Sequence, residues 1–350
     1  MSEKVAVGLS GGVDSAAALF FLKQQGYQCV GVHFRLADLP EEEAEQQRKE
    51  AEKAAQNQDV PFYTADLRAL FGRHVTDYFS REYLDGRTPN PCIVCNEKVR
   101  WNGLMEFGKQ MGIRLVATGH YAKIVEQGGR YALAVPEDRK KDQTYFLYRL
   151  SQEQLSRTRF PLGNYKKQDV RMIAEKLGIQ AAKKPDSQEI CFLPDGDRSK
   201  WFCNNKEVKK GEILDDAGNV LGHHRGICYY TVGQRKGLGI SGPEPLYVRA
   251  ICKEENRLLV SGREQIYSME ANVYHTVWMA PEQEKLKGAA RIRSGGPLIP
   301  CTAYREEEGY WKVLFLEPVW AVAPGQSMVF YQNNAVVFGG IIENARVSSD

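Results

Sequence analysis

The stretch that decides the fold is Gly8-Leu9-Ser10-Gly11-Gly12-Val13-Asp14-Ser15, which lies between an apolar run and an alanine-rich helical run. Its adjacent glycines let the backbone turn tightly and bring N–H groups close to an anion, and the following helix adds the positive end of its dipole. Ser10 and Ser15 can donate hydroxyl groups to phosphate oxygens, and Asp14 could hold Mg²⁺ against the same phosphates. Because the stretch lacks the lysine of the pattern GxxxxGK(S/T), it predicts a site for the pyrophosphate part of ATP and not a grip on the γ-phosphate.

Apolar and helical segments alternate from the start of the chain to about residue 180. The predicted buried strands are 4–9, 28–34, 61–67 and 114–119, and the predicted helices between them include 14–25 and 41–58. This alternation predicts an α/β fold with a doubly wound, mostly parallel sheet covered by helices. The segment 41–58 is charged at nearly every turn, so we expect a solvated helix with no functional role.

The pattern changes after residue 195, where short β-rich runs separated by glycine and proline replace the long helices. These predicted strands are 226–230, 246–253, 273–279, 290–293, 310–316, 327–331 and 335–343. We therefore expect three domains: an ATP-binding α/β domain over 1–195, a small central β domain over 196–268, and a C-terminal β-barrel over 269–350.

The composition limits the class of protein. With 350 residues, of which 43% are hydrophobic, the chain can bury more than one core. The sequence has no N-terminal leader pattern and no apolar run of about 20 residues, so we expect a cytoplasmic protein. Eight cysteines are too few for a disulfide scaffold of this length. Since the formal net charge is only +3, a surface that binds nucleic acid must be a local basic patch.

Two further segments are predicted to complete the nucleotide pocket, because a doubly wound sheet binds its ligands beyond the carboxyl ends of its strands. Phe34 ends the second predicted strand, and Gly119 ends a later one. Phe34 would provide an apolar wall for adenine, and Gly119 would allow the backbone to approach it closely. We therefore expect ATP to contact residues 8–15, Phe34 and Gly119.

Three cysteines stand in positions that favour reactivity. Cys92 and Cys95 precede a predicted helix at 97–111, whose N-terminus would raise their thiolate fraction, and Cys191 follows a lysine-containing loop. One such thiol can carry sulfur while another resolves it. Alternatively, the three thiolates could hold three irons of a [4Fe–4S] cluster, and the sequence does not separate the two routes. A zinc site is disfavoured because no second CxxC pair occurs. The cysteines within apolar runs are predicted core residues: Cys29, Cys228, Cys252 and Cys301.

Six motifs follow one another along nearly the whole chain. They are SGGVDS (10–15), NPCIVCN (90–96), ATGHYA (117–122), KDQTYFL (141–147), DSQEICF (186–192) and YTVGQRKGLGI (230–240). In this set and order the chain resembles the bacterial tRNA-specific 2-thiouridylases, which belong to the PP-loop superfamily of N-type ATP pyrophosphatases. The resemblance implies a catalytic PP-loop domain, a small central β domain and a tRNA-contacting C-terminal β-barrel, in agreement with the three expected domains.

The resemblance also implies roles for individual residues. Cys95 would be the nucleophile, and Cys191 would carry a persulfide and form a transient disulfide with Cys95. Asn90, Pro91 and Cys92 would contact a target base flipped out of the anticodon. Further residues match positions that touch tRNA: His120, Lys141, Asp142, Gln143, Arg293, Ser294 and Gln326. Many family members have aspartate where this chain has Cys92, so the acid–base role of that aspartate is not carried over, and a thiol there favours the iron–sulfur alternative.

The implied activity is ATP-dependent 2-thiolation of the wobble uridine of tRNA. ATP would adenylate O2 of the base, with loop amides and Mg²⁺ stabilising the departing pyrophosphate, and sulfur would then attack C2 and displace AMP. An upstream persulfide donor protein or sulfide would supply the sulfur. Several basic residues could together hold tRNA phosphates, although each alone is expected to be solvated. They are Lys140, Lys141, Lys166, Lys167, Lys183, Lys184, Lys209, Lys210, Arg291 and Arg293.

Two other classes of function remain open. A PP-loop amidotransferase or a lysidine-type ligase would keep the ATP loop but would not need Cys95 and Cys191, and an amidotransferase would require a glutaminase domain or partner. A non-enzymatic RNA-binding iron–sulfur protein would not need the intact Ser10, Asp14 and Ser15. Release of pyrophosphate that depends on ATP separates the enzymes from the binding protein.

Overall fold

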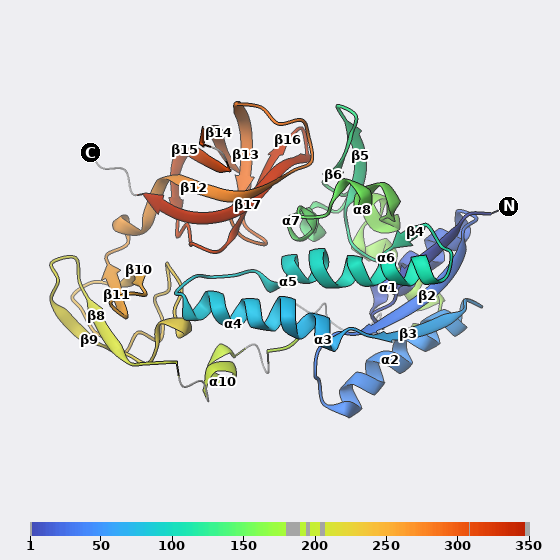
Figure 1. Cartoon of the computed structure of the whole chain (residues 1–350), viewed down its shortest axis with the longest axis horizontal. Coiled ribbons are helices and arrows are strands. Elements are labelled where there is room, and N and C mark those ends of the chain that lie inside the picture. The colour runs from blue at the N-terminus through green and yellow to red at the C-terminus, as the bar shows by residue number, and fades with distance from the viewer. Residues whose placement is uncertain (1, 180–189, 194–196, 204–206, 308, 347–350) are drawn as a thin grey trace. The chain divides into compact units, whose positions relative to one another are not determined.

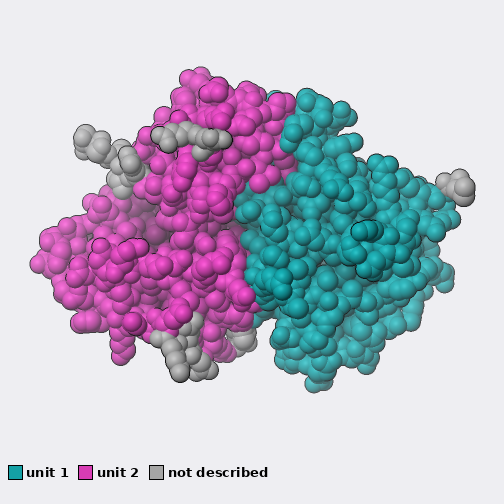
Figure 2. Space-filling model, viewed as in Figure 1, with its two compact units in different colours: residues 1–75, 92–192, 333–336 teal, residues 76–91, 193–332, 337–350 magenta. Residues whose placement is uncertain are grey.

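The computed structural model describes residues 2–179, 190–193, 197–203, 207–307 and 309–346 (Figure 1). Its contacts divide the chain into two compact units, which Figure 2 colours separately. The first unit contains residues 1–75, 92–192 and 333–336, and the second contains residues 76–91, 193–332 and 337–350. Within the described ranges, no helix combines the length and apolar character needed to cross a bilayer.

A parallel sheet forms the centre of the first unit. In pairing order its strands are β3 (Phe62–Asp66), β2 (Gln28–Arg35), β1 (Lys4–Gly8), β4 (Leu115–Ala117) and β7 (Thr158–Arg159). Each neighbouring pair is parallel, with Lys4 opposite Gln28 and Val5 opposite Leu115. The prediction of a buried strand at 61–67 is wrong as to burial, because β3 lies at an edge of the sheet and is largely exposed.

Helices cover both faces of this sheet. On one face, α1 (Val13–Gln24) and α2 (Glu41–Gln56) share a core with Val5 of β1. On the other face, α6 (Trp101–Gln110) shares a core with Ala6 of the same strand. Successive residues of β1 therefore point into opposite cores, as the alternation of a strand requires. The predicted doubly wound α/β fold is confirmed (Figure 1).

An antiparallel hairpin, which the sequence pattern did not predict, follows β4 in the first unit. It consists of β5 (Lys123–Gln127) and β6 (Arg130–Ala134). Further helical segments in the first 180 residues are α3 (Arg68–Phe71), η1 (Gly72–Thr76), α4 (Asp77–Leu84), α5 (Pro91–Val94), η2 (Cys95–Arg100), η3 (Arg139–Lys141), α7 (Thr144–Leu147), α8 (Gln152–Arg157), η4 (Pro161–Asn164) and α9 (Lys167–Lys176). The predicted helix at 97–111 is therefore a π-helical turn, η2, followed by α6.

The second unit contains a small sheet with its own core. Its strands pair in the order β10 (Tyr247–Cys252), β11 (Arg257–Ser261), β8 (Gly211–Leu214) and β9 (Val220–His224). Short helical segments in this region are α10 (Arg198–Phe202), η7 (Ile227–Tyr229) and η8 (Glu264–Ile266). The predicted strand at 226–230 is wrong, because Gly226 has φ +144° and the apolar residues after it form a short buried 3-10 turn.

A closed antiparallel β-barrel completes the second unit (Figure 1). Its strands follow in the order β12 (Tyr267–Trp278), β15 (Tyr310–Trp320), β14 (Ile299–Glu307), β13 (Lys285–Arg291), β16 (Ser327–Gln332) and β17 (Ala335–Arg346), and β12 pairs again with β17. Trp311, Phe330 and Phe338 fill the interior. The predicted barrel is confirmed, although β14 was not among the predicted strands.

Candidate active site

The glycine-rich loop at residues 8–15 connects β1 to α1 as predicted. Gly11 has φ +80°, and a Cβ at this residue would lie 2.8 Å from the backbone oxygen of Gln47, so a side chain does not fit. The Ser15 hydroxyl accepts a hydrogen bond from Ser10 N at 3.2 Å, and the two serine hydroxyl oxygens lie 3.3 Å apart. The loop is therefore held in one conformation by the two serines that were expected to contact phosphate.

A cavity of about 460 Å³ opens at the carboxyl ends of β1, β2 and β4. This is the edge at which doubly wound sheets bind nucleotides. The predicted site residues that line it are Gly8, Leu9, Ser10, Asp14, Ser15, Phe34, Gly119, His120, Gln143 and Cys191. The structure thus brings the loop, both predicted pocket segments and one of the three candidate cysteines to a single cavity.

Gly119 packs directly against the first turn of α1. A Cβ at residue 119 would lie 2.6 Å from the carbonyl carbon of Asp14 and 2.7 Å from Ser15 N. The sequence suggested that glycine here leaves room for adenine. The structure adds a second requirement, because any side chain would collide with the backbone of the phosphate loop.

We expect Gly119→Ala to weaken ATP binding by about tenfold or more, since the added methyl group must push the N-terminus of α1 out of position. Equilibrium titration with ATP measures the effect. The matched control is Gly72→Ala, because a Cβ at residue 72 would meet nothing within 4 Å and its φ is −51°. An unchanged dissociation constant for Gly119→Ala would show that the loop tolerates the displacement.

A buried lysine holds the aspartate of the loop. Lys167 Nζ donates to both carboxylate oxygens of Asp14, at 2.7 Å each, and Tyr121 Oη donates to Asp14 Oδ1 at 3.0 Å. Lys167 is only 6% exposed. The expectation that Lys167 is a solvated surface residue is therefore wrong. Sequence reasoning missed this ion pair because 153 residues separate its two members.

Two histidines of the cavity are kept neutral. His33 Nδ1 lies 2.9 Å from the carbonyl oxygen of Leu9, which only accepts, so Nδ1 carries the proton. Burial, helped by the charges of Arg48 and Arg100, lowers the pKa of His33. Burial and then the charge of Arg100 lower the pKa of His120 to about 3. Neither ring therefore adds a positive charge to the cavity near neutral pH.

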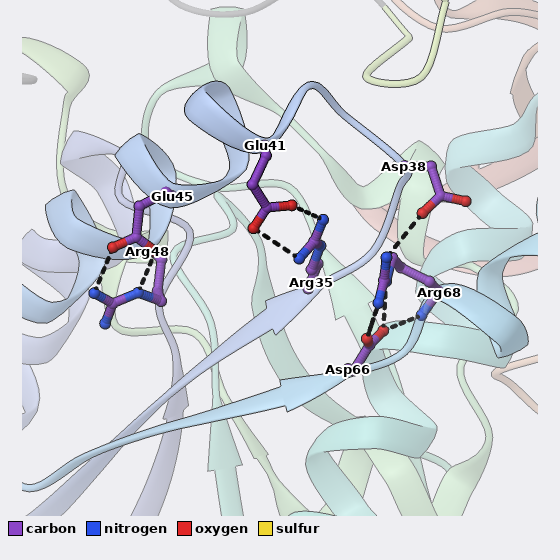
Figure 3. A network of polar contacts seen from close by, with 7 residues as sticks. All are labelled: Arg35, Asp38, Glu41, Glu45, Arg48, Asp66 and Arg68. Atoms are coloured by element: carbon purple, nitrogen blue, oxygen red, sulfur yellow. Dashed lines mark hydrogen bonds and ion pairs between the residues drawn. The ribbon is translucent and has the colours of Figure 1, made fainter.

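Paired charges line the rim of the cavity (Figure 3). Arg35, at the end of β2, pairs with Glu41 of α2 at 2.6 Å, and Arg48 pairs with Glu45 at 2.7 Å. The Arg48 side chain lowers the pKa of the Glu45 carboxyl to about 2 through its hydrogen bonds. The charged helix expected at 41–58 is α2, and packing on the sheet brings residues of its first turns to the strand ends, where they line the cavity.

The three candidate thiols interact with one another electrostatically. Cys95 is buried in an apolar cluster with Phe71 and Val99, Cys92 is half-buried, and Cys191 is exposed. Burial, followed by the proximity of Cys191 and Cys95, raises the pKa of the Cys92 thiol to about 12. Although the Cys191 side chain reaches solvent, desolvation by nearby protein atoms raises the pKa of its thiol. The increased thiolate fraction expected for Cys92 from the helix N-terminus is therefore wrong, because burial outweighs it. Among the described residues, no group of three or more histidine, cysteine, aspartate or glutamate side chains is arranged to hold a metal ion.

Known families match most of the chain in three consecutive segments. A family model described as the tRNA methyl transferase HUP domain matches residues 3–195. Models described as the tRNA methyl transferase PRC-barrel domain and the aminomethyltransferase beta-barrel domain match residues 199–262 and 268–342.

Curated relatives of similar length carry one name. The tRNA-specific 2-thiouridylase MnmA of Chlorobium luteolum is 42% identical, over 98% of this chain and 97% of the relative. The protein of the same name from Clostridioides difficile is also 42% identical, over 99% of each chain. The chain belongs to the tRNA-specific 2-thiouridylase family. Among solved structures, the U34-tRNA thiolase NcsA of Methanococcus maripaludis with its [4Fe-4S] cluster is 17% identical to this chain. The match covers 54% of this chain and 60% of the thiolase. Its TM-score of 0.36 is too low to inform the site.

The residues expected to touch tRNA in this family lie in both units. In the first unit, Gln143 and His120 line the cavity, and Gln143 Oε1 also accepts a hydrogen bond from Tyr121 N at 2.8 Å. Lys141 and Asp142 precede Gln143 and are half-buried. The motif residues Lys183, Lys184, Asp186 and Ser187 lie outside the described residues.

In the second unit, Gln326 lies beside the segment that carries the proposed base contacts. Gln326 Nε2 donates a hydrogen bond to Thr88 O at 3.0 Å. Thr88 lies two residues before Asn90, which is half-buried, and three residues before Pro91, which is buried. The structure therefore joins two positions that the sequence placed more than 200 residues apart. Arg293 and Ser294 are exposed in the turn after β13.

Proposed function

We propose that this protein uses ATP to convert the wobble uridine of tRNA to 2-thiouridine. One observation carries the proposal: the phosphate-binding loop and the persulfide candidate Cys191 line the same cavity. An enzyme that activates an oxygen with ATP and then replaces it with sulfur needs both within reach of one substrate atom. The proposal extends to the division of labour among the segments 1–195, 196–268 and 269–350, with catalysis in the first and tRNA contacts shared with the last.

The first half-reaction is adenylation. The uridine O2 attacks the α-phosphate of ATP, and pyrophosphate leaves against the amides of residues 8–15 and the N-terminus of α1. Asn90, Pro91 and Cys92 contact the base, which must leave the anticodon stack to expose O2 and C2. Phe34 and Gly119 border the adenine. The carbonyl oxygen of uridine thereby becomes part of AMP, which is a good leaving group.

The second half-reaction transfers sulfur. The terminal sulfur of a Cys191 persulfide attacks C2, the C2–O bond breaks, and AMP departs with the oxygen. The Cys95 thiolate then attacks Cys191 Sγ, the bond between Cys191 Sγ and the transferred sulfur breaks, and its electron pair remains on the sulfur of 2-thiouridine. The product disulfide between Cys95 and Cys191 needs an external dithiol for reduction. An upstream persulfide donor then transfers its outer sulfur to the reduced Cys191 thiolate and keeps a thiolate of its own. Where sulfide is the source, hydrosulfide instead attacks Cys191 Sγ in the disulfide before its reduction, the bond to Cys95 breaks, and Cys95 leaves as a thiolate.

The scheme assigns no step to Mg²⁺ or to a [4Fe–4S] cluster, the two cofactors that the sequence suggested. Both oxygens of Asp14 accept from Lys167, so this carboxylate does not fit the expected Mg²⁺ ligand unless the lysine moves. Among the described residues, Cys92, Cys95 and Cys191 are not arranged as a set that could hold a metal ion. A [4Fe–4S] cluster on these three cysteines therefore does not fit this conformation. The persulfide route uses Cys95 and Cys191 without a cluster. We place the reaction in the cytoplasm, where tRNA is modified.

The test is a thiolation assay with anaerobically purified protein of measured iron and acid-labile sulfide content. Unmodified tRNA, ATP with Mg²⁺, and either sulfide or a persulfide donor are supplied, and 2-thiouridine is quantified in the digested tRNA. We expect product without iron, and we expect Cys92→Ala to retain activity. Product that requires iron and is lost in Cys92→Ala would replace the persulfide route with a cluster, and no product with any sulfur source would overturn the proposed function.

A further inference from the structure

A π-helical turn places Arg100 beside Cys95. In an α-helix, residues five apart differ in direction by about 140°, so these two side chains would diverge. The segment η2, Cys95–Arg100, is a π-helix, whose hydrogen bonds join residues five apart and bring them to the same side. The Arg100 guanidinium interacts electrostatically with Cys95 on this turn.

Among the described residues, Cys95 belongs to a cluster of apolar side chains. The thiol is 5% exposed and packs among Ala37, Phe71, Val75 and Val99. A charge in such a place is costly unless an opposite charge is paired with it. The guanidinium of Arg100 is the paired group that the structure provides.

Arg100 in turn has thiols as its partners. Among the described residues, no carboxylate lies within ion-pair distance of its guanidinium, and its electrostatic neighbours are Cys95, Cys191 and Cys92. Burial lowers the pKa of Arg100, whereas its interactions with these thiols raise it. The interactions have the larger effect, so the pKa of Arg100 is raised. The other titratable rings that sense its charge, His33 and His120, are neutral.

Arg100 also lines the nucleotide cavity together with Cys191. We infer that Arg100 is the counter-ion for the Cys95 thiolate that attacks Cys191 Sγ, and that it positions the sulfur-transfer half of the reaction and not the adenylation half. The inference rests on the proposed function. Arg100 acts through Cys95 and is therefore a positioning residue.

The step that Arg100 supports also occurs without tRNA. The Cys95 thiolate attacks Cys191 Sγ, the bond to the terminal sulfur of the persulfide breaks, and that sulfur leaves with the electron pair and takes a proton from water as hydrosulfide. The two cysteines end as a disulfide, so no further oxidant is needed. Discharge of hydrosulfide from protein preloaded with inorganic polysulfide measures this step directly.

The experiment compares Arg100→Gln, Arg100→Lys and Arg100→Ala with the wild type in three single-turnover assays. These are hydrosulfide discharge, tRNA-dependent release of pyrophosphate from ATP, and formation of 2-thiouridine. The matched control is Lys98→Gln, because Lys98 lies on the same π-helical turn and its side chain is 45% exposed and paired with Glu97. Guanidinium ions are added to Arg100→Ala to replace the missing group.

We expect Arg100→Gln to slow discharge and thiouridine formation by about 100-fold, while pyrophosphate release stays within about twofold of the wild type. Arg100→Lys should retain most of the wild-type rate of hydrosulfide discharge. Added guanidinium should restore part of the discharge activity of Arg100→Ala, and Lys98→Gln should behave as the wild type. The inference is overturned if Arg100→Gln discharges hydrosulfide at the wild-type rate, or if pyrophosphate release falls equally and neither lysine nor guanidinium restores discharge. A wild-type protein that discharges sulfide but never thiolates tRNA would instead overturn the proposed function.

Discussion

Replacing Cys191 by serine should reduce formation of 2-thiouridine by at least about 1,000-fold, while tRNA-dependent release of pyrophosphate from ATP continues. A hydroxyl group cannot carry a sulfane sulfur, whereas the glycine-rich loop that activates the uridine oxygen is untouched. Cys191 is exposed and lines the nucleotide cavity, so the substitution removes one reactive atom and little packing. Quantifying 2-thiouridine and pyrophosphate in the same reaction measures sulfur transfer and adenylation together.

The matched control for this variant is Cys203→Ser. Cys203 is the other exposed free cysteine of the described residues, and it belongs to the second unit. Wild-type activity in Cys203→Ser would show that the loss follows from the position of Cys191 and not from the number of thiols. Thiouridine formed at a normal rate by Cys191→Ser would mean that another atom delivers the sulfur, and the persulfide assignment would then fail.

Replacing Lys167 by methionine should lower the rate of pyrophosphate release by about 100-fold or more. Lys167 Nζ lies 2.7 Å from both oxygens of Asp14 at the N-terminus of α1, where the phosphates of ATP are expected. Without the ammonium group, the Asp14 carboxylate adds an unbalanced negative charge that repels the triphosphate. Because the Asp14 side chain keeps 33% of its surface in water, the loss of folding stability should be modest, about 1–2 kcal/mol.

Thermal unfolding and single-turnover pyrophosphate release test the two parts of this expectation. Lys166→Met is the matched control, since Lys166 precedes Lys167 in sequence but is exposed. Adding Asp14→Asn to Lys167→Met should restore much of the stability, because it removes the unpaired carboxylate. Pyrophosphate release at the wild-type rate in Lys167→Met would show that the ion pair only supports the fold.

The architecture of both units could be predicted from local sequence patterns. Strand and helix periodicities, with glycine and proline between them, depend on neighbours along the chain, and they indicated the parallel sheet and the barrel. Where prediction failed, a local pattern was compatible with two structures. The apolar run at 226–230 suits a strand or a buried turn, and η7 is the turn. The charged run at 41–58 correctly indicated a helix, but its pattern did not show that the first turns of this helix line the cavity.

By itself, the sequence determined the fold class and the family and singled out the glycine-rich loop and three candidate thiols, because these follow from residues adjacent in the chain and from the order of six motifs. Only the tertiary structure decided which charges those groups face. Lys167 reaches Asp14 across 153 residues, and Arg100 reaches Cys95 through a π-helical turn that an α-helical periodicity does not anticipate. Electrostatic interactions depend on distance in space and on burial, and neither quantity is written in the spacing of residues along a chain.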